Sequence, residues 1–280
     1  MANREHPGAH RQLASQETST RPVYISQRLN VCYRDVRLAV INRQASVIVD
    51  LAREQHEGGA DYLDLCAAGL PDERGSLAWM LGAVQQEVDC PLVLDSADPG
   101  TLLHGFGLCV KPPIINAISV SAVRDGVARD LMCLPARSFI ISAYDPKTSN
   151  NPADRIHALR EVLNVSAPGH AAALIADPLF YPQRFDAQRW DESCRTAREI
   201  RQAWPDLGLL CAVGNVTFRA RTSGRATRLP GTTDRTWSHA EVANRALAEG
   251  FDWIICDVMR LGPDARAASG ETGQRGSIVL

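Results

Sequence analysis

The chain has 280 residues, of which 45% are hydrophobic and 22% are charged, and its formal net charge is −2. This length and composition indicate a globular protein with room for one α/β barrel or two ordinary domains. The near-zero charge gives no basic field to attract nucleic acid or a membrane surface, and no run approaches the roughly 20 apolar residues of a membrane span.

The N-terminal segment, residues 1–20, is polar and has no apolar stretch, so we expect a flexible leader rather than a secretory signal. Residues 21–280 are expected to form a single domain. The eight cysteines are scattered, with no CxxC pair and no close spacing to histidine. This pattern predicts free thiols in a reducing cytoplasm, with neither a disulfide framework nor a metal site.

Eight short apolar runs have the composition of buried parallel strands. They lie at residues 23–26, 62–65, 92–94, 114–117, 139–142, 173–176, 209–213 and 253–256. The segments between them predict helices over residues 44–56, 76–88, 153–163, 191–204 and 239–249. Glycines 58, 59 and 250 follow two of these helices and suit a left-handed helix end. Alternating strands and helices imply right-handed parallel crossovers, and eight of them favour a closed (β/α)8 TIM barrel over an open sheet.

Five polar residues occupy the ends of these predicted strands or the positions just beyond. They are Asp64, Asp95, Asn116, Asp177 and Asn215. In a (β/α)8 barrel the carboxyl ends of the strands form the rim that carries the active site. A carboxylate there needs hydrogen-bond donors, and the planar N–H edge of a heterocycle supplies them much as an arginine does. An asparagine reads a ring edge that shows both a donor and an acceptor. The alternative is that each residue caps a helix or binds backbone amides at a βα turn.

Two segments depart from the alternation of strands and helices. Residues 218–237 are poor in apolar side chains and contain Arg219, Arg221, Arg225, Arg228 and Arg235. Because this segment follows the seventh predicted strand, we expect it to project from the rim, either toward acidic groups of a substrate or partner or as a solvated loop. The tail from Gly262 is rich in Gly, Ala and Ser and predicts only a weak eighth helix.

Several short motifs occur in order along the chain. They are SQRLN at residues 26–30, EGGA at 57–60, LDLC at 63–66, LVLDS at 92–96, IINA at 114–117, ADPLFYP at 176–182 and VGNVT at 213–217. They resemble GERIN, EGGA, LDLN, LCLDS, MINS, IDPLILP and LSNVS of the pterin-binding barrel family, and specifically of its methyltetrahydrofolate:corrinoid methyltransferases. The resemblance spans about residues 22 to 258.

The resemblance implies a methyltransferase that moves a methyl group between a corrinoid (methylcobalamin) protein and N5 of tetrahydrofolate in one-carbon metabolism. Asp95, Asn116 and Asp177 would hold the pterin ring, and Asn215 would lie near N5. Asp177 and Asn215 would be the catalytic residues. The implied pterin site also contains Asp64, Gln27 and Ser96.

The substrate implied by this resemblance is tetrahydrofolate or 5-methyltetrahydrofolate, and the implied assembly is a homodimer. The chain has no DxHxxG corrinoid-binding signature, because His157 lacks the following glycine and lies in a predicted helix. A separate corrinoid-binding protein would therefore have to supply the corrinoid at the open rim.

Two residues differ from the family pattern. Gln27 stands where the family has glutamate, and Cys66 stands where it has asparagine. One alternative is dihydropteroate synthase, but residues 66–71 lack its Ser- and Arg-rich phosphate loop, and residues 256–258 lack its basic motif at the last strand. A further alternative is a folate-binding protein without turnover, which the departures at Gln27 and Cys66 would favour.

Overall fold

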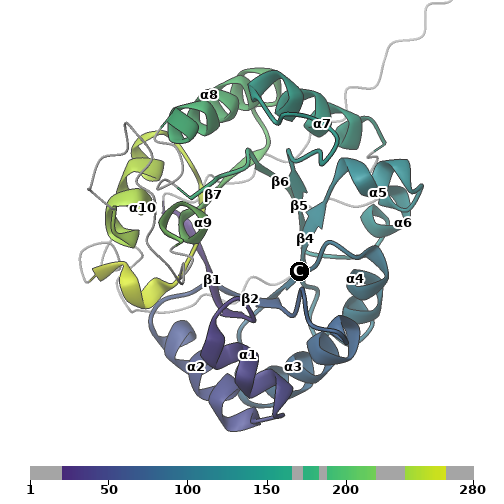
Figure 1. Ribbon diagram of the computed structural model, residues 1–280, viewed down its shortest axis with the longest axis vertical. Helices are drawn as coiled ribbons and strands as arrows, with labels where there is room; N and C mark the ends of the chain where they lie inside the picture. Colours follow the sequence, from purple (N-terminus) through teal and green to yellow (C-terminus); the bar gives the residue numbers. More distant parts are fainter. Residues whose placement is uncertain (1–20, 166–172, 183–187, 219–236, 263–280) are drawn as a thin grey trace, which may run out of the picture.

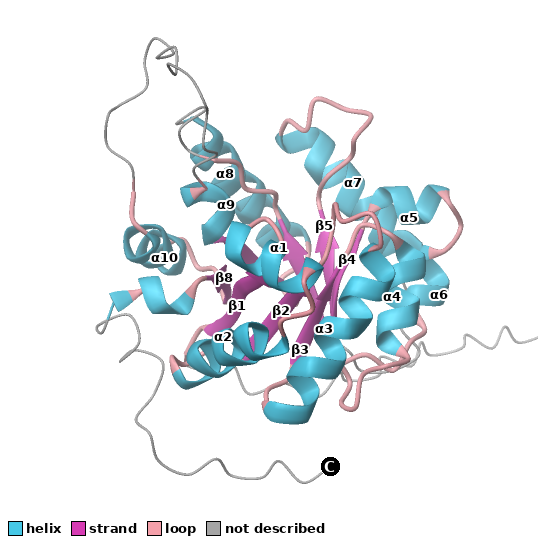
Figure 2. Cartoon of the chain, turned by 60° about the horizontal axis from the view of Figure 1, so that its bottom comes forward, coloured by secondary structure: helices cyan, strands magenta, loops and turns pink. Residues whose placement is uncertain are grey.

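The computed structural model describes residues 21–165, 173–182, 188–218 and 237–262. Within these ranges, eight parallel strands form a closed barrel in chain order, and β8 pairs with β1 to complete it. Figure 1 looks along the barrel and shows the helices as an outer ring, and Figure 2 shows the strands side by side inside that ring. The predicted (β/α)8 barrel is confirmed.

The strands are short, as in most barrels of this kind. Their bounds are β1 Val23–Asn30, β2 Tyr62–Cys66, β3 Leu92–Asp95, β4 Ile114–Ile118, β5 Ser138–Ser142, β6 Ala173–Asp177, β7 Gly208–Ala212 and β8 Trp253–Cys256. Every predicted strand is confirmed, with shifts of a few residues at the ends. One residue was assigned wrongly: Val213, predicted as the end of a strand, is the first residue of a helix.

The helices comprise the five predicted ones and several shorter ones. Their bounds are α1 Arg34–Ile41, α2 Ala45–Glu57, α3 Glu73–Glu87, α4 Pro99–Phe106, α5 Val120–Arg124, α6 Ala128–Met132, α7 Pro152–Val165, α8 Gln188–Ala203, α9 Val213–Thr217 and α10 His239–Ala248, with a 3-10 helix η1 at Val258–Arg260. The helices that the sequence did not predict have eight residues or fewer, which is too short for a periodic apolar face to stand out.

Local sequence explains where several helices begin and end. Ser238 and Glu241 form a capping box at the start of α10, with hydrogen bonds of 3.2 and 2.8 Å between side chains and backbone. Gly59 (φ 102°) and Gly250 (φ 85°) take the predicted left-handed conformation after α2 and α10. The prediction for Gly58 is wrong: its φ of −70° still follows the helix, so the chain turns one residue later.

The side chains of a strand alternate between the barrel interior and the helices. In β2, Leu63 and Leu65 are fully buried, and Asp64 between them lines the pocket at the barrel mouth. The rings of Tyr62 and Trp253, at the amino ends of β2 and β8, lie 5.9 Å apart. An aromatic pair thus packs at the amino end of the barrel, and polar groups gather at the carboxyl end.

Some predictions concern residues that the structure does not describe. The N-terminal leader, the arginine-rich residues 219–236 and the tail from residue 263 lie outside the described ranges. The eight cysteines all lie within these ranges and are free thiols. Among the helices that are described, none is both long and apolar enough to cross a membrane.

Candidate functional site

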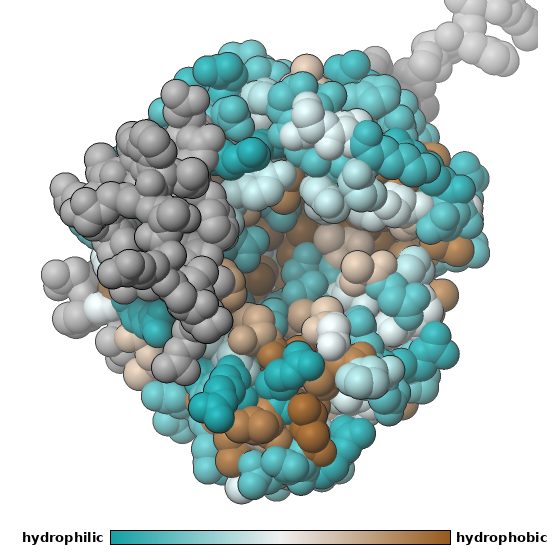
Figure 3. Space-filling model, in the orientation of Figure 1, coloured by the Kyte–Doolittle hydropathy of each residue, from teal (hydrophilic) through white to brown (hydrophobic). Residues whose placement is uncertain are grey.

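A cavity of about 500 Å³ opens at the carboxyl ends of the strands, where Figure 3 shows the face hollowed at its centre. All seven predicted site residues line it. They are Gln27, Asp64, Asp95, Ser96, Asn116, Asp177 and Asn215. The structure therefore brings together, in one pocket, residues that are spread over almost 190 positions of the chain (215 − 27 = 188). Their roles in binding and catalysis remain predictions.

The seven residues come from different depths of the barrel. Asp95 and Asp177 are the last residues of β3 and β6, as predicted. The prediction that the residue lies at a strand end is wrong for Asp64, Asn116 and Asn215. Asp64 and Asn116 lie inside β2 and β4, because both strands continue two residues further, and Asn215 lies on α9, because a helix begins directly after β7.

Two irregularities in strand pairing coincide with site residues. The register between β1 and β2 shifts between Ser26 and Leu29, and Gln27 lies within that shift. The register between β4 and β5 shifts between Asn116 and Ile118. Bulges of this kind re-aim side chains at barrel rims and next to active sites. Gln27 and Asn116 thus line the pocket at two places where the strand pairing is irregular.

The three aspartates of the pocket carry raised pKa values. Burial raises the pKa of Asp64 well above its usual range, and the nearby charge of Asp95 adds to the effect. Burial also raises the pKa of Asp95 to about 6, although the Cys66 thiol donates a hydrogen bond to it. The pKa of Asp177 is raised to about 6 by burial, against the opposing effects of the Leu179 N–H and of Arg155. Carboxyl groups that titrate near neutral pH in a cleft suit both hydrogen-bonded recognition and proton transfer.

Neighbouring groups hold these acids in place. Asn116 Nδ2 donates to Asp64 Oδ1 at 3.4 Å, and Asp64 is only 1% exposed. The hydroxyl of Ser96 donates to Glu73, and its backbone N–H donates to the Asn116 carbonyl at 2.9 Å. Because its proton is already engaged, the hydroxyl of Ser96 is better placed to brace this edge of the pocket than to donate to a ligand.

Gln27 packs against the start of α9. Its Nε2 donates to the hydroxyl of Tyr33 at 3.2 Å, and its whole amide fills the space beside Gly214 that a side chain there would take. A Cβ atom at position 214 would overlap that amide. The departure from glutamate at position 27 therefore fits the structure: the amide donates to Tyr33 and leaves no additional charge beside the three aspartates.

This close approach leads to a prediction for Gly214→Ala. The new methyl group must displace the Gln27 amide and break its bond to Tyr33. We therefore expect the methyl transfer that the sequence resemblance implies to be roughly ten- to a hundredfold slower, the range for a misplaced active-site group. Helix α9 should persist, because alanine favours helix over glycine. Steady-state rates and thermal denaturation measure the two effects.

The matched control is Gly82→Ala in α3, where an added Cβ has no neighbour within 4 Å. It should leave the rate unchanged. The double variant Gln27→Ala/Gly214→Ala, which removes the obstructing amide, should be no worse than Gln27→Ala alone. A Gly214→Ala variant with normal rates would contradict the tight packing.

Asn215 differs from the other site residues because its side chain is exposed. Its amide makes no hydrogen bond to any residue in the described ranges, so it can turn toward a ligand. The helix that carries it is anchored at Thr217, whose hydroxyl donates to the Val213 carbonyl at 2.9 Å and lies 3.2 Å from Nδ1 of His239. Burial lowers the pKa of His239 to about 4, so this contact is made by a neutral ring at physiological pH.

Other residues line the pocket that the motifs did not single out. They include Tyr33, Tyr144 and Phe218, which follow predicted strands, and Ser142, which is the last residue of one. This position was the signal in the sequence, and for Tyr144 it also allowed a place in the pocket as the alternative to a plain loop. Tyr144 and Phe218 are 42% and 43% exposed. Two exposed aromatic rings at the mouth of a polar pocket are suited to contact a flat ligand.

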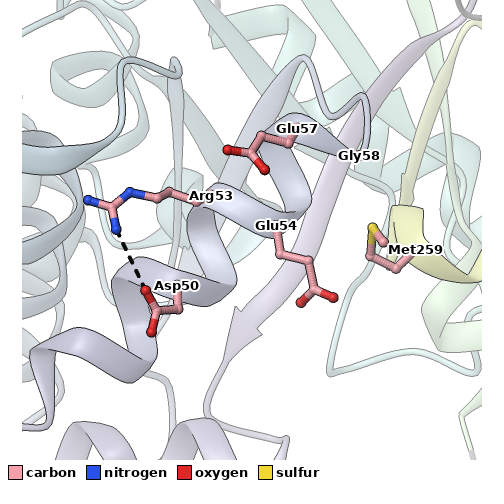
Figure 4. Close-up of a pocket in the computed structure, with 6 residues that line it drawn as sticks. All are labelled: Asp50, Arg53, Glu54, Glu57, Gly58 and Met259. Carbon is pink, nitrogen blue, oxygen red and sulfur yellow. Dashed lines mark ion pairs between the residues drawn. The ribbon is translucent and has the colours of Figure 1, made fainter.

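A second hollow, of about 400 Å³, lies between α2 and η1 on the outside of the barrel and contains none of the predicted site residues. Figure 4 shows its lining, with Asp50, Glu54 and Glu57 on one helix and Arg53 of that helix paired with Asp50 at 3.6 Å. Within the described ranges, no group of three or more His, Cys, Asp or Glu side chains is arranged to hold a metal ion. The barrel mouth is therefore the stronger candidate site.

Solved structures with the same fold include dihydropteroate synthases. The enzyme of Xanthomonas albilineans in complex with 7,8-dihydropteroate aligns with a TM-score of 0.59 and 18% identity, covering 88% of this chain and 92% of that one. The enzyme of Coxiella burnetii in complex with pteroic acid aligns with a TM-score of 0.61 and 13% identity, covering 90% and 93%. The chain thus has the (β/α)8 barrel fold of the dihydropteroate synthases.

In sequence, the chain is similar to a methyltransferase. It is 27% identical over 202 residues to the methylcorrinoid:tetrahydrofolate methyltransferase of Eubacterium limosum, covering 70% of this chain and 74% of that protein. No protein-family model matches the chain. Together, the relative and the shared fold confirm the resemblance to the pterin-binding barrels and their corrinoid-linked methyltransferases.

Proposed function

We propose that this protein is a methyltransferase that moves a methyl group between a corrinoid protein and N5 of tetrahydrofolate. The observation that carries the proposal is the convergence of Asp64, Asp95, Asn116, Asp177 and Asn215 on one pocket of a size suited to a pterin. The similarity to a protein named for this reaction supports it. In this proposal the protein acts in the cytoplasm as a homodimer.

The acids at the bottom of the pocket would bind the pterin. A pterin presents a planar edge of N–H donors, and the carboxylates of Asp95 and Asp177 can accept from it in the manner of a carboxylate–arginine pair. Asn116, already hydrogen-bonded to Asp64, offers one amide to a ring edge that shows both donor and acceptor. The raised pKa values fit this role, because a ligand supplies the donors that the buried carboxylates lack.

Asn215 would act at the reacting nitrogen. When the methyl group arrives from a corrinoid, N5 becomes positively charged before its proton leaves, and in the reverse direction N5 must gain that charge before it can act as a leaving group. An amide carbonyl that accepts from N5–H stabilises this charge in the transition state. The partner protein would supply the corrinoid, whose cobalt carries or accepts the methyl group.

Titration calorimetry with tetrahydrofolate and 5-methyltetrahydrofolate tests the pterin pocket directly. We expect micromolar binding of at least one, followed by absorbance changes of methylcobalamin when tetrahydrofolate and a corrinoid protein are added. Absence of binding to either folate would refute the proposal. Binding without turnover, across several corrinoid partners, would favour a folate-binding protein. Turnover of a dihydropterin pyrophosphate with p-aminobenzoate would instead show a dihydropteroate synthase.

Folate affinity should depend on pH through the aspartates. The ionised forms of Asp95 and Asp177 accept hydrogen bonds, and with pKa values of about 6 both are mostly ionised at pH 7.5. We expect the association constant to fall roughly tenfold for each of these groups between pH 7.5 and pH 5. Calorimetry at pH 5, 6 and 7.5 measures the change.

The stability of the ligand-free protein should respond to pH with the opposite sign. The pKa of each aspartate is higher in the folded state than its ordinary value of 3.8, so the folded state binds more protons between about pH 4 and 6. The contribution of these groups to the unfolding free energy is therefore largest below that window and is lost as the pH rises through 6.

For the binding prediction, equal folate affinities at pH 5 and 7.5 would contradict a role for these carboxylates in binding.

A further inference from the structure

Arg155, on α7, is the largest side chain that is fully buried in the described part of the protein. Its Nε donates to the Asn150 carbonyl at 2.7 Å, before α7 begins. Its Nη1 donates to the carbonyls of Pro178 and Leu179 at 3.3 and 3.4 Å, in the loop after β6. The guanidinium thus joins the loops that follow β5 and β6. A buried charge is tolerated only when it is bonded in this way.

Both loops contain a residue in an unusual backbone conformation, and Arg155 is bonded to each. Asn150 has a φ of 55° and Leu179 a φ of 70°. The described ranges contain a single further non-glycine residue with positive φ, Arg43. This region is unfavourable for a side chain such as leucine and persists only when the surroundings hold it.

The backbone of Leu179 also contacts Asp177 directly. The N–H of Leu179 donates to Asp177 Oδ1 at 2.9 Å. On the other side, the hydroxyl of Ser193 donates to the Leu179 carbonyl at 2.6 Å and lies 3.1 Å from Nη1 of Arg155. The guanidinium therefore supports the peptide units that orient the carboxylate at the pocket.

We propose that Arg155 is a positioning residue, which does not touch the substrate but fixes the loop that presents Asp177 at the pocket. Only the statement that Asp177 binds folate rests on the proposed function. The support of Asp177 by Arg155 is a property of the protein without ligand.

Several charged or titratable groups contribute to the environment of this pair. Those that face Asp177 or Arg155 are Asp95 on β3, Cys211 on β7, Tyr181 in the loop after β6, and Arg189 and Glu192 on α8. Glu192 lies 3.5 Å from the guanidinium but is partly exposed, so it balances the charge of Arg155 only in part. Since Arg155 lowers the pKa of Asp177, its removal should raise that pKa.

The test is a titration of Asp177 by infrared spectroscopy in the protein without ligand, with its carboxyl band assigned by comparison with Asp177→Asn. In Arg155→Met we expect the midpoint to rise by roughly one pH unit, the usual order for losing a nearby opposite charge. Arg155→Lys keeps the positive charge but cannot make all the hydrogen bonds of the planar guanidinium. The Asp177 midpoint should therefore shift less in this variant. KM for folate at pH 7 should rise roughly tenfold in Arg155→Met and recover in part at higher pH, with a smaller change in kcat.

Arg201→Met is a matched control. Arg201, on α8, also bonds two loop carbonyls, those of Leu207 and Gly250, both at 3.0 Å, but at the opposite end of the barrel. We expect it to lower the melting temperature and leave the Asp177 midpoint unchanged. If Arg155→Met fails to fold, Ser193→Ala can be used instead. It removes the hydroxyl that donates to the Leu179 carbonyl and accepts from Arg155 Nη1, and the midpoint should rise by a smaller amount.

An Asp177 midpoint that is unchanged in Arg155→Met, or in Ser193→Ala where that variant has to be used, would overturn the inference. So would an equal shift in Arg201→Met, because a merely structural role would then explain it. The outcome is independent of the proposed function: if the wild type binds no folate, that proposal fails, while the titration of Asp177 still decides the role of Arg155.

Discussion

Asp177→Asn should weaken folate binding roughly a hundredfold or more. The substitution keeps the size of the side chain and removes the charge that would accept from the pterin edge, and hydrogen bonds to a charged group contribute about 1.5–3 kcal/mol each. Asp177 is the last residue of β6, lines the pocket and accepts one backbone hydrogen bond from Leu179, so it retains acceptor capacity for a ligand. Calorimetry with tetrahydrofolate measures the loss.

The same variant should not lose stability at pH 7.5. Because the pKa of Asp177 is raised to about 6 in the folded state, the ionised form is disfavoured by burial, and asparagine avoids that penalty. Loss of binding together with unchanged or higher thermal stability would distinguish a binding residue from a structural one. Asp206→Asn, on the exposed turn between α8 and β7, is the control. It should change neither the folate affinity nor the thermal stability. Unchanged folate affinity in Asp177→Asn would refute the placement of the pterin.

Asn215→Ala should have a different outcome: folate binding is retained and the transfer rate falls by ten- to a thousandfold. The amide is exposed on α9 and makes no hydrogen bond within the described ranges, so its loss leaves neither the fold nor the acids of the pocket disturbed. Removal of one donor or acceptor that acts on charge developing in the transition state has an effect of this size. Single-turnover transfer, measured at saturating folate with a corrinoid protein, isolates the step.

The control for this variant is Asn244→Ala, an exposed asparagine on α10 that lies away from the pocket lining. It should keep the wild-type rate. Equal rates for the wild type and Asn215→Ala would remove the proposed catalytic role of Asn215. A large loss of folate affinity in Asn215→Ala would instead show that the amide serves in ground-state binding.

The residue patterns of the chain are enough to predict the architecture and the polar residues that meet in the pocket. Eight apolar runs that alternate with helical patterns leave few options other than a parallel barrel, because parallel strands need crossovers and a closed sheet satisfies both edges. Barrel topology brings the carboxyl ends of all strands to one rim, so the set Asp64, Asp95, Asn116, Asp177 and Asn215 was identified without coordinates. The short helices α1, α4, α5, α6 and α9 were missed because eight or fewer residues carry little periodicity.

How these groups are held depends on contacts that form in the folded protein. The depth of Asp64 and Asn116 in their strands depends on where the pairing of neighbouring strands ends, which no local pattern specifies. The contact between Gln27 and Gly214 joins β1 to α9, and Arg155 joins the loops after β5 and β6. The sequence showed Arg155 only as one charged residue in a helix. Its burial, its bonds to Asn150 and Leu179 and its effect on Asp177 arise from contacts between distant segments, which exist only once the barrel has closed.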